Sequence, residues 1–149
     1  MNPTMNTASS SKLTITLNGI EHEVLNCSTV EEMETKEMLM LRDPQGYESI
    51  YKTPYGRAKD YEESLRRTGL SRYVTQHTFE NFTTEKAWQR AVKDKAMDFV
   101  ENTEGWFLIS GQSGSGKTHI CNAIAIRLLR KGQRLKHMLW LEEATRMKF

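Results

Sequence analysis

The sequence predicts an α/β fold in which a small α+β module precedes an incomplete β-α-β core. Three observations support this prediction. Alternating apolar residues flank an Asn-Gly pair near the N-terminus, which is typical of a β-hairpin. A glycine-rich loop connects a short apolar run to a helix-like segment in the C-terminal half. A second apolar run follows that segment, so one parallel-strand crossover is expected there.

Length and composition exclude several classes of protein. With 149 residues, the chain has room for one modest domain, or for a small module joined to part of a larger one. The hydrophobic share of 38% and the charged share of 27% are those of a globular protein. Two cysteines, Cys27 and Cys121, cannot build a disulfide framework or a four-ligand zinc site. Without a secretion signal or a long apolar run, a cytoplasmic protein with no membrane partner is expected.

The first half of the chain predicts a tail and a partner-binding module. Residues 1–12 are rich in Asn, Thr and Ser and are expected to form a disordered tail. Residues 13–17 and 20–24 alternate around Asn18-Gly19, which predicts a hairpin. Ser28 and Glu31 resemble a capping box that begins a helix over residues 30–42, followed by a loop at 44–54 and a helix at 57–67 that ends before Gly69. The module is expected to span residues 13–70.

The second half, residues 71–149, predicts part of a nucleotide-binding domain. Thr83 or Thr84 can cap an amphipathic helix that ends near residue 102, and residues 106–110 read as a strand buried on both faces. A helix is expected over 117–131, with Gly132 at its end, and a second strand over 134–140. The buried face of the 117–131 helix is expected to comprise Ile120, Cys121, Ile124, Ala125, Leu128 and Leu129, with His119, Asn122 and Arg130 on the other face.

The segment Gly111-Gln112-Ser113-Gly114-Ser115-Gly116-Lys117-Thr118 has the spacing of a P-loop, or Walker A motif. Backbone N–H groups at a helix N-terminus can converge on phosphate, and glycines and small serines keep that approach open. Lys117 is expected to reach the β- and γ-phosphates of ATP, and the Thr118 hydroxyl to bind Mg²⁺. The predicted cofactor-binding residues are Gly111, Ser113, Gly114, Ser115, Gly116, Lys117, Thr118 and His119, although a surface or capping role for His119 is an open alternative.

Three stretches carry a resemblance to a known family: Thr78-Phe79-Glu80-Asn81-Phe82, the phosphate loop with its helix, and residues 138–148. Together, residues 69–149 resemble the helicase-loader ATPases of the DnaC and IstB type, a branch of the AAA+ P-loop NTPases. The resemblance implies ATP and Mg²⁺ as cofactors, and a replicative helicase or a transposase as partner. It also implies that Phe79 and Phe82 lie near the adenine, whereas the residues themselves favour core aromatics.

ATP hydrolysis is doubtful from the sequence. The family's hydrolysis needs acids at the end of a later strand, the Walker B motif, and an arginine from a neighbouring subunit. After Thr118 the only acids are Glu142 and Glu143, and they follow the wrong strand for that role. No catalytic residue is therefore predicted. The expectation is a chain truncated before the Walker B strand, which forms an oligomer only if the AAA+ domain is completed.

Two other functions stay open. One is a small-molecule kinase, although no lid arginines or acceptor-binding acid follow Lys117. The other is a non-catalytic interaction module formed by residues 13–42. Single-stranded DNA is a further candidate partner because basic residues cluster near the end of the 117–131 helix, with a solvated face as the alternative: Arg127, Arg130, Lys131, Arg134, Lys136 and His137.

Overall fold

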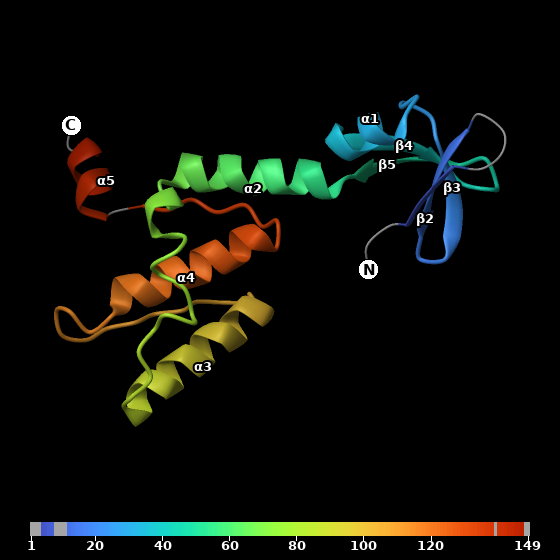
Figure 1. Ribbon diagram of the computed structural model, residues 1–149. Helices are drawn as coiled ribbons and strands as arrows, with labels where there is room; N and C mark the ends of the chain where they lie inside the picture. The colour runs from blue at the N-terminus through green and yellow to red at the C-terminus, as the bar shows by residue number, and fades with distance from the viewer. Residues whose placement is uncertain (1–3, 8–11, 139, 148–149) are drawn as a thin grey trace. The chain divides into compact units, whose positions relative to one another are not determined.

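The computed structural model describes residues 4–7, 12–138 and 140–147, and the chain divides into two compact units. The units are Met1–Asp60 and Tyr61–Phe149. Their boundary lies inside helix α2 (Pro54–Thr68), earlier in the chain than the boundary expected near residue 70. Figure 1 shows the helices and strands of each unit.

The N-terminal unit contains a five-stranded antiparallel sheet with the order β1-β2-β3-β4-β5. The predicted hairpin is confirmed: β2 pairs with β3 through a turn in which Asn18 and Gly19 have φ values of 52° and 81°. Both residues tolerate this left-handed conformation, which two-residue hairpin turns require. The strands are β1 (Thr4–Thr7), β2 (Leu13–Leu17), β3 (Ile20–Val24), β4 (Met38–Arg42) and β5 (Glu48–Lys52).

Three expectations for this unit were wrong. Strand β1 lies within the expected tail and pairs with β2, while residues 1–3 and 8–11 lie outside the described part of the chain. The expected helix over 30–42 is only α1 (Val30–Thr35), which Thr29, not Ser28, caps by accepting a bond from Glu32 N. The residues beyond it form β4, and the expected loop at 44–54 contains β5.

Sheet pairing explains why the segment after α1 is a strand. Leu39 and Leu41 are each 1% exposed, whereas Met38 and Met40, which alternate with them, face outward. This alternation places one side of β4 on the core with Ile15, Val24 and Met33. A run of apolar residues that are not branched at Cβ suits a helix equally well until a neighbouring strand offers hydrogen bonds.

The C-terminal unit contains helices and no strand among its described residues (Figure 1). Its buried side chains form two apolar clusters. A short 3-10 turn, η1 (Ser71–Tyr73), precedes α3 (Ala87–Glu101), α4 (Lys117–Arg130) and α5 (Trp140–Arg146). Helix α3 begins after Lys86, whose backbone N–H donates to the Gln89 side chain, and not at Thr83 or Thr84. Gly69 and Gly132, with φ values of 70° and 78°, end α2 and α4 as predicted.

Neither predicted strand of the β-α-β core is present in the described residues of this unit. Residues 106–110 and 134–138 belong to no strand, residue 139 is outside the described part, and Trp140 begins α5. Phe107 and Ile109 pack against the core, but Trp106 and Leu108 are 99% and 93% exposed. An isolated apolar segment cannot form a sheet without a partner strand. None of the described helices is long and apolar enough to cross a bilayer.

Candidate nucleotide-binding site

The glycine-rich loop leads directly into the first turn of α4. Gly111, Gly114 and Gly116 have φ values of 152°, 75° and 87°, which L residues with a side chain rarely adopt. Ser115 N–H donates to Gln112 O at 3.3 Å, so the loop turns back on itself before α4 begins. Gly116 occupies the N-cap position, where the first N–H groups of the helix have no partner within the helix. These groups and the helix dipole favour an anion at this point.

The side chains of the loop have different environments. The Lys117 ammonium donates to Gly111 O at 2.9 Å and to Gln112 O at 2.6 Å, so its charge is held over the start of the loop. The Thr118 side chain is exposed, as are Ser113 and Gly114. The structure thus brings seven of the eight predicted site residues into one loop and helix turn, with a cation and an accessible hydroxyl that suit phosphate and Mg²⁺.

His119, the eighth predicted site residue, is held away from the loop by other contacts. Its Nε2 lies 2.7 Å from Thr78 O, and because a carbonyl only accepts, Nε2 carries a proton. The ring stacks on His77 with a centroid distance of 4.9 Å and meets the edge of Phe82 at 5.4 Å. The structure therefore places His119 against residues 77–82.

The phenylalanines upstream form part of the core beneath the loop. Phe79 and Phe82 are 3% and 7% exposed and belong to one cluster with Val100 and Ile120. Phe82 Cε2 would lie 2.9 Å from a Cβ added to Gly116, so only glycine fits against this ring. The residue-based interpretation of both as core aromatics agrees with this burial.

Two expectations about the buried face of α4 were wrong. Cys121 is exposed, although it was expected in the core. Asn122 was expected on the polar face but is 1% exposed, and its Nδ2 lies 2.8 Å from His77 Nδ1. Ala123 and Ile126 are also buried, because neighbours cover α4 on more than one side. Helical spacing alone could not identify this polar contact, since His77 is distant in sequence.

Half of the predicted basic cluster makes contacts within the C-terminal unit. Arg127 pairs with Glu80 at 3.1 Å, Arg130 donates to Tyr61 Oη at 3.1 Å, and Lys131 pairs with Glu101 at 2.7 Å. Glu143, one of the two late acids, lies 3.3 Å from Arg146 on α5. Arg127, Arg130 and Lys131 therefore contact, in turn, residue 80, α2 and α3.

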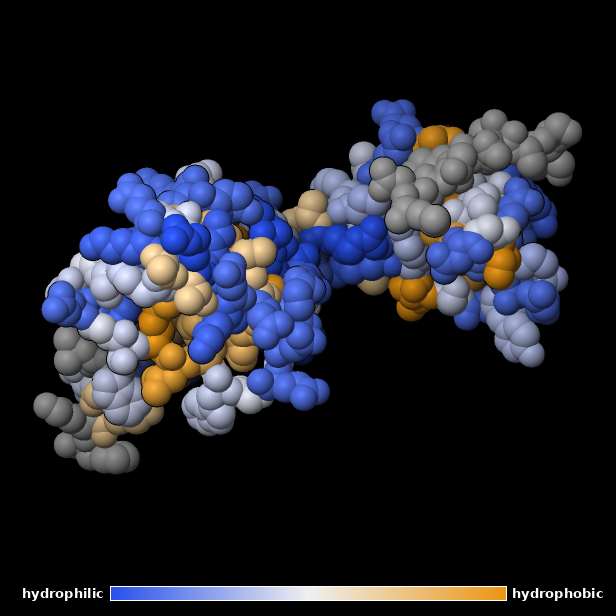
Figure 2. All heavy atoms as spheres, turned by 90° about the horizontal axis from the view of Figure 1, so that it is seen from below, coloured by the Kyte–Doolittle hydropathy of each residue, from blue (hydrophilic) through white to orange (hydrophobic). Residues whose placement is uncertain are grey.

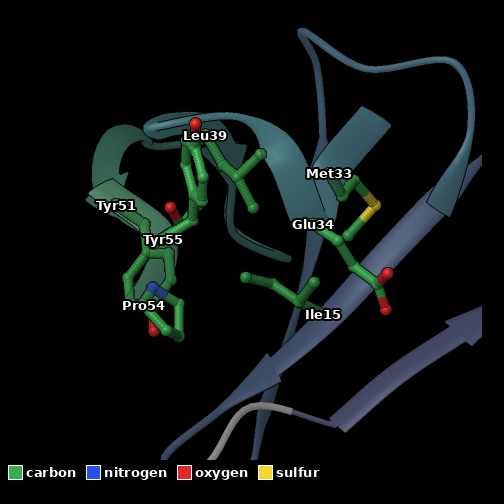
Figure 3. Close-up of a pocket in the computed structure, with 8 residues that line it drawn as sticks. Ile15, Met33, Glu34, Leu39, Tyr51, Pro54 and Tyr55 are labelled. Carbon is green, nitrogen blue, oxygen red and sulfur yellow. The ribbon is translucent and has the colours of Figure 1, made fainter. Parts of the chain in front are cut away.

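The N-terminal unit has a separate apolar cavity of about 170 Å³. Figure 3 shows side chains from β2, α1, β4, β5 and the start of α2 around it: Ile15, Met33, Glu34, Leu39, Tyr51, Thr53, Pro54 and Tyr55. On the outward face of the sheet, Met40 pairs with Ile50, and these residues are 44% and 72% exposed. Figure 2 shows apolar side chains reaching the surface of each unit. Exposed apolar side chains on an outermost strand are typical of a protein-binding surface.

Comparison with known proteins places residues 56–144 in the family described as IstB-like ATP binding protein. Among curated proteins, the chain is similar to the replicative helicase loader DnaC of Escherichia coli strain K12, of Escherichia coli O157:H7 and of Shigella flexneri. Each is 32% identical over 80 residues, which cover 52% of this chain and 33% of the relative. The match thus spans a third of the length of these relatives. No solved structure matches the chain.

Proposed function

Because the chain belongs to the family of IstB-like ATP binding proteins, we propose that it binds ATP with Mg²⁺ through residues 111–118 and acts as a cytoplasmic accessory in DNA replication. Similarity to proteins named replicative helicase loaders supports the second part, with a replicative helicase as partner. The alternative role is that of an IstB-like helper in transposition, with a transposase as partner.

The conformation of the glycine loop at the start of α4 carries the proposal of ATP binding. Gly114 and Gly116 have left-handed conformations directly before Lys117, so backbone N–H groups and one ammonium group lie at the same helix end. The negative charge of a triphosphate is complementary to these N–H groups and to the ammonium group. Thr118 and the phosphates would together supply the hard oxygen ligands that Mg²⁺ prefers.

The proposed activity is ATP binding, and no residue is assigned to ATP hydrolysis. Hydrolysis needs a group that orients water and a metal-bound carboxylate. Glu143 pairs with Arg146 on α5. The proposed role is therefore that of an ATP-binding accessory, with no hydrolytic step assigned.

Titration of the whole chain with a fluorescent ATP analogue tests the proposal. Binding should require Mg²⁺ and should weaken by at least about tenfold in Lys117→Ala, because a charge-assisted contact to phosphate is lost. Lys136→Ala is the matched control, since it removes an exposed lysine outside the loop. Equal affinity of the Lys117→Ala variant and the unchanged chain would contradict the proposal.

The cavity and the outward face of β4 and β5 favour a protein-binding role for the N-terminal unit. Met40 and Ile50 would meet apolar groups of a helicase or transposase. Ile50→Lys in the whole chain should abolish capture of that partner while nucleotide binding persists. Capture that is unaffected by Ile50→Lys would contradict this role.

We also propose contact with single-stranded DNA through Arg134 and Lys136, which are exposed after α4. Binding through phosphates weakens steeply as salt rises. An affinity that does not change between low and moderate salt would contradict this proposal.

A further inference from the structure

A continuous series of side-chain contacts connects residues 77–82 with the phosphate loop. His77 stacks on His119 at 4.9 Å, and His119 packs against Phe82 at 5.4 Å. Phe82 in turn occupies the space next to Gly116, 2.9 Å from where a Cβ would lie. Residues 77–82 form neither helix nor strand, so their position depends on such contacts.

The second observation is a buried polar atom at the other end of this series. Asn122 is 1% exposed, and its Oδ1 has no hydrogen-bond partner among the described residues. A buried acceptor without a partner costs about 1–3 kcal/mol, which an apolar residue of similar size would avoid. The amide nitrogen of Asn122 lies 2.8 Å from Nδ1 of His77. This contact fixes the plane of the imidazole that stacks on His119.

We propose that His77, oriented by Asn122, is a positioning residue for the phosphate loop. His77 holds the ring of His119, whose Nε2–H donates to Thr78 O at 2.7 Å. That bond keeps residues 78–82 against the first turn of α4, and Phe82 then supports Gly116 in the conformation that directs N–H groups at phosphate. The inference rests on the proposed binding of ATP and adds residues outside the loop that set its affinity.

Two substitutions of His77 separate positioning from packing. His77→Leu introduces an apolar side chain of similar size that gives Asn122 no acceptor, whereas His77→Gln replaces the acceptor nitrogen of His77 with an acceptor oxygen. The whole chain is titrated with the fluorescent ATP analogue and Mg²⁺, and the folded fraction is measured in parallel. His77→Leu should weaken binding by the folded protein by about three- to tenfold, the equivalent of one lost hydrogen bond. His77→Gln, which offers Asn122 an acceptor but has no ring to stack on His119, should weaken binding less than His77→Leu does.

Asn122→Leu provides the second test and decides the matter if His77→Leu does not fold. This variant removes the unsatisfied oxygen, so the chain should keep its stability while its affinity falls by about threefold or more. Unchanged affinity in folded His77→Leu and Asn122→Leu would overturn the positioning role and leave the loop's own function intact. Equal binding by the unchanged chain and Lys117→Ala would instead overturn the proposed function, and this inference with it.

Discussion

At the scale of single residues, Gly116 is the place where the core and the phosphate loop meet. Its φ of 87° excludes most side chains, and the Phe82 ring fills the space beside it. Gly132 has a similar φ of 78° at the other end of α4, with nothing within 4 Å of an added Cβ. An alanine at Gly132 would therefore suffer backbone strain alone, whereas an alanine at Gly116 would also clash with Phe82.

Gly116→Ala should destabilise the C-terminal unit more than Gly132→Ala does. Both variants carry the strain of a left-handed alanine, about 1–2 kcal/mol. Gly116→Ala also forces the buried Phe82 ring to move, which adds about 1–3 kcal/mol of overpacking. Urea denaturation measures both. An equal loss of unfolding free energy in the two variants would contradict this prediction, because it would mean that the Phe82 ring moves aside without destabilising the core.

We expect His77 to make the stability of the C-terminal unit sensitive to pH. Burial, and then the nearby charge of His119, lower the pKa of His77 below its ordinary value of 6.5. Tyr73 stacks on the ring at 4.6 Å and Arg72 lies over Tyr73, while α4 contributes His119 and Asn122. The unfolded chain therefore takes up a proton near pH 6.5 that the folded unit takes up only at lower pH. The contribution of His77 to the free energy of unfolding should be complete above about pH 6.5 and should be lost as the pH falls from there to the lower pKa of the folded unit.

Comparison with His77→Gln isolates this effect from that of the acidic residues. Urea denaturation near neutral pH and at about pH 5.5 should show a smaller loss in His77→Gln than in the unchanged chain. An equal loss in both proteins would assign the pH dependence to other groups.

At the scale of elements, the start of α2 depends on one buried hydroxyl. Thr53 is 3% exposed, and its Oγ1 accepts from Gly56 N–H at 3.0 Å and donates to Lys36 O at 2.6 Å. It thus caps α2 and fastens it to the turn between α1 and β4. Thr53→Val should cost about 1–2 kcal/mol, because it keeps the shape but removes both bonds.

Thr68→Val is the matched control at the other end of α2. In the part of the chain that the structure describes, the Thr68 hydroxyl donates to carbonyls of the preceding turn, Ser64 O at 2.8 Å and Leu65 O at 3.2 Å. Such back-bonding adds little to stability. Thermal denaturation should therefore show a clear loss for Thr53→Val and a small change for Thr68→Val; the reverse order would contradict the capping role.

Local signals decided which elements could be predicted from the sequence. Asn18-Gly19 sets its own turn, and Lys117 follows a glycine that begins a helix, so the hairpin and α4 were found. The strand β4 was not found, because Leu39 and Leu41 become a strand only through pairing with distant residues. The predicted strands at 106–110 and 134–140 failed for the same reason, since the described residues offer them no partner. His77 and Asn122 were missed because no spacing rule connects them.

At the scale of the whole molecule, the chain joins a β-rich unit to a helical one. The family match begins within α2 and covers most of the C-terminal unit, whereas β1 to β5 lie outside it. The proposed nucleotide site and the apolar cavity therefore belong to different units. The sequence predicted this two-part organisation, but it placed the boundary after α2 because the helix end at Gly69 was the local signal.

Nucleotide should stabilise one unit only. A ligand that binds the native state protects the structure that forms its site. Hydrogen exchange with ATP and Mg²⁺ should slow at residues 111–120 and 77–82 and stay unchanged in the sheet from β2 to β5. The control is Lys117→Ala, in which the protection should disappear. Protection of the sheet, or none at residues 77–82, would contradict this picture.

Trp106 offers an optical signal for the segment that precedes the phosphate loop. Its indole is 99% exposed, while Phe107 beside it packs on the core. In a variant with Trp88→Phe and Trp140→Phe, emission from Trp106 should be red-shifted and readily quenched by acrylamide. Any polypeptide that lies along residues 106–110 would shield the indole, shift its emission to the blue and slow quenching. The fluorescence of Trp106 alone can therefore be used to follow the binding of a further strand beside residues 106–110.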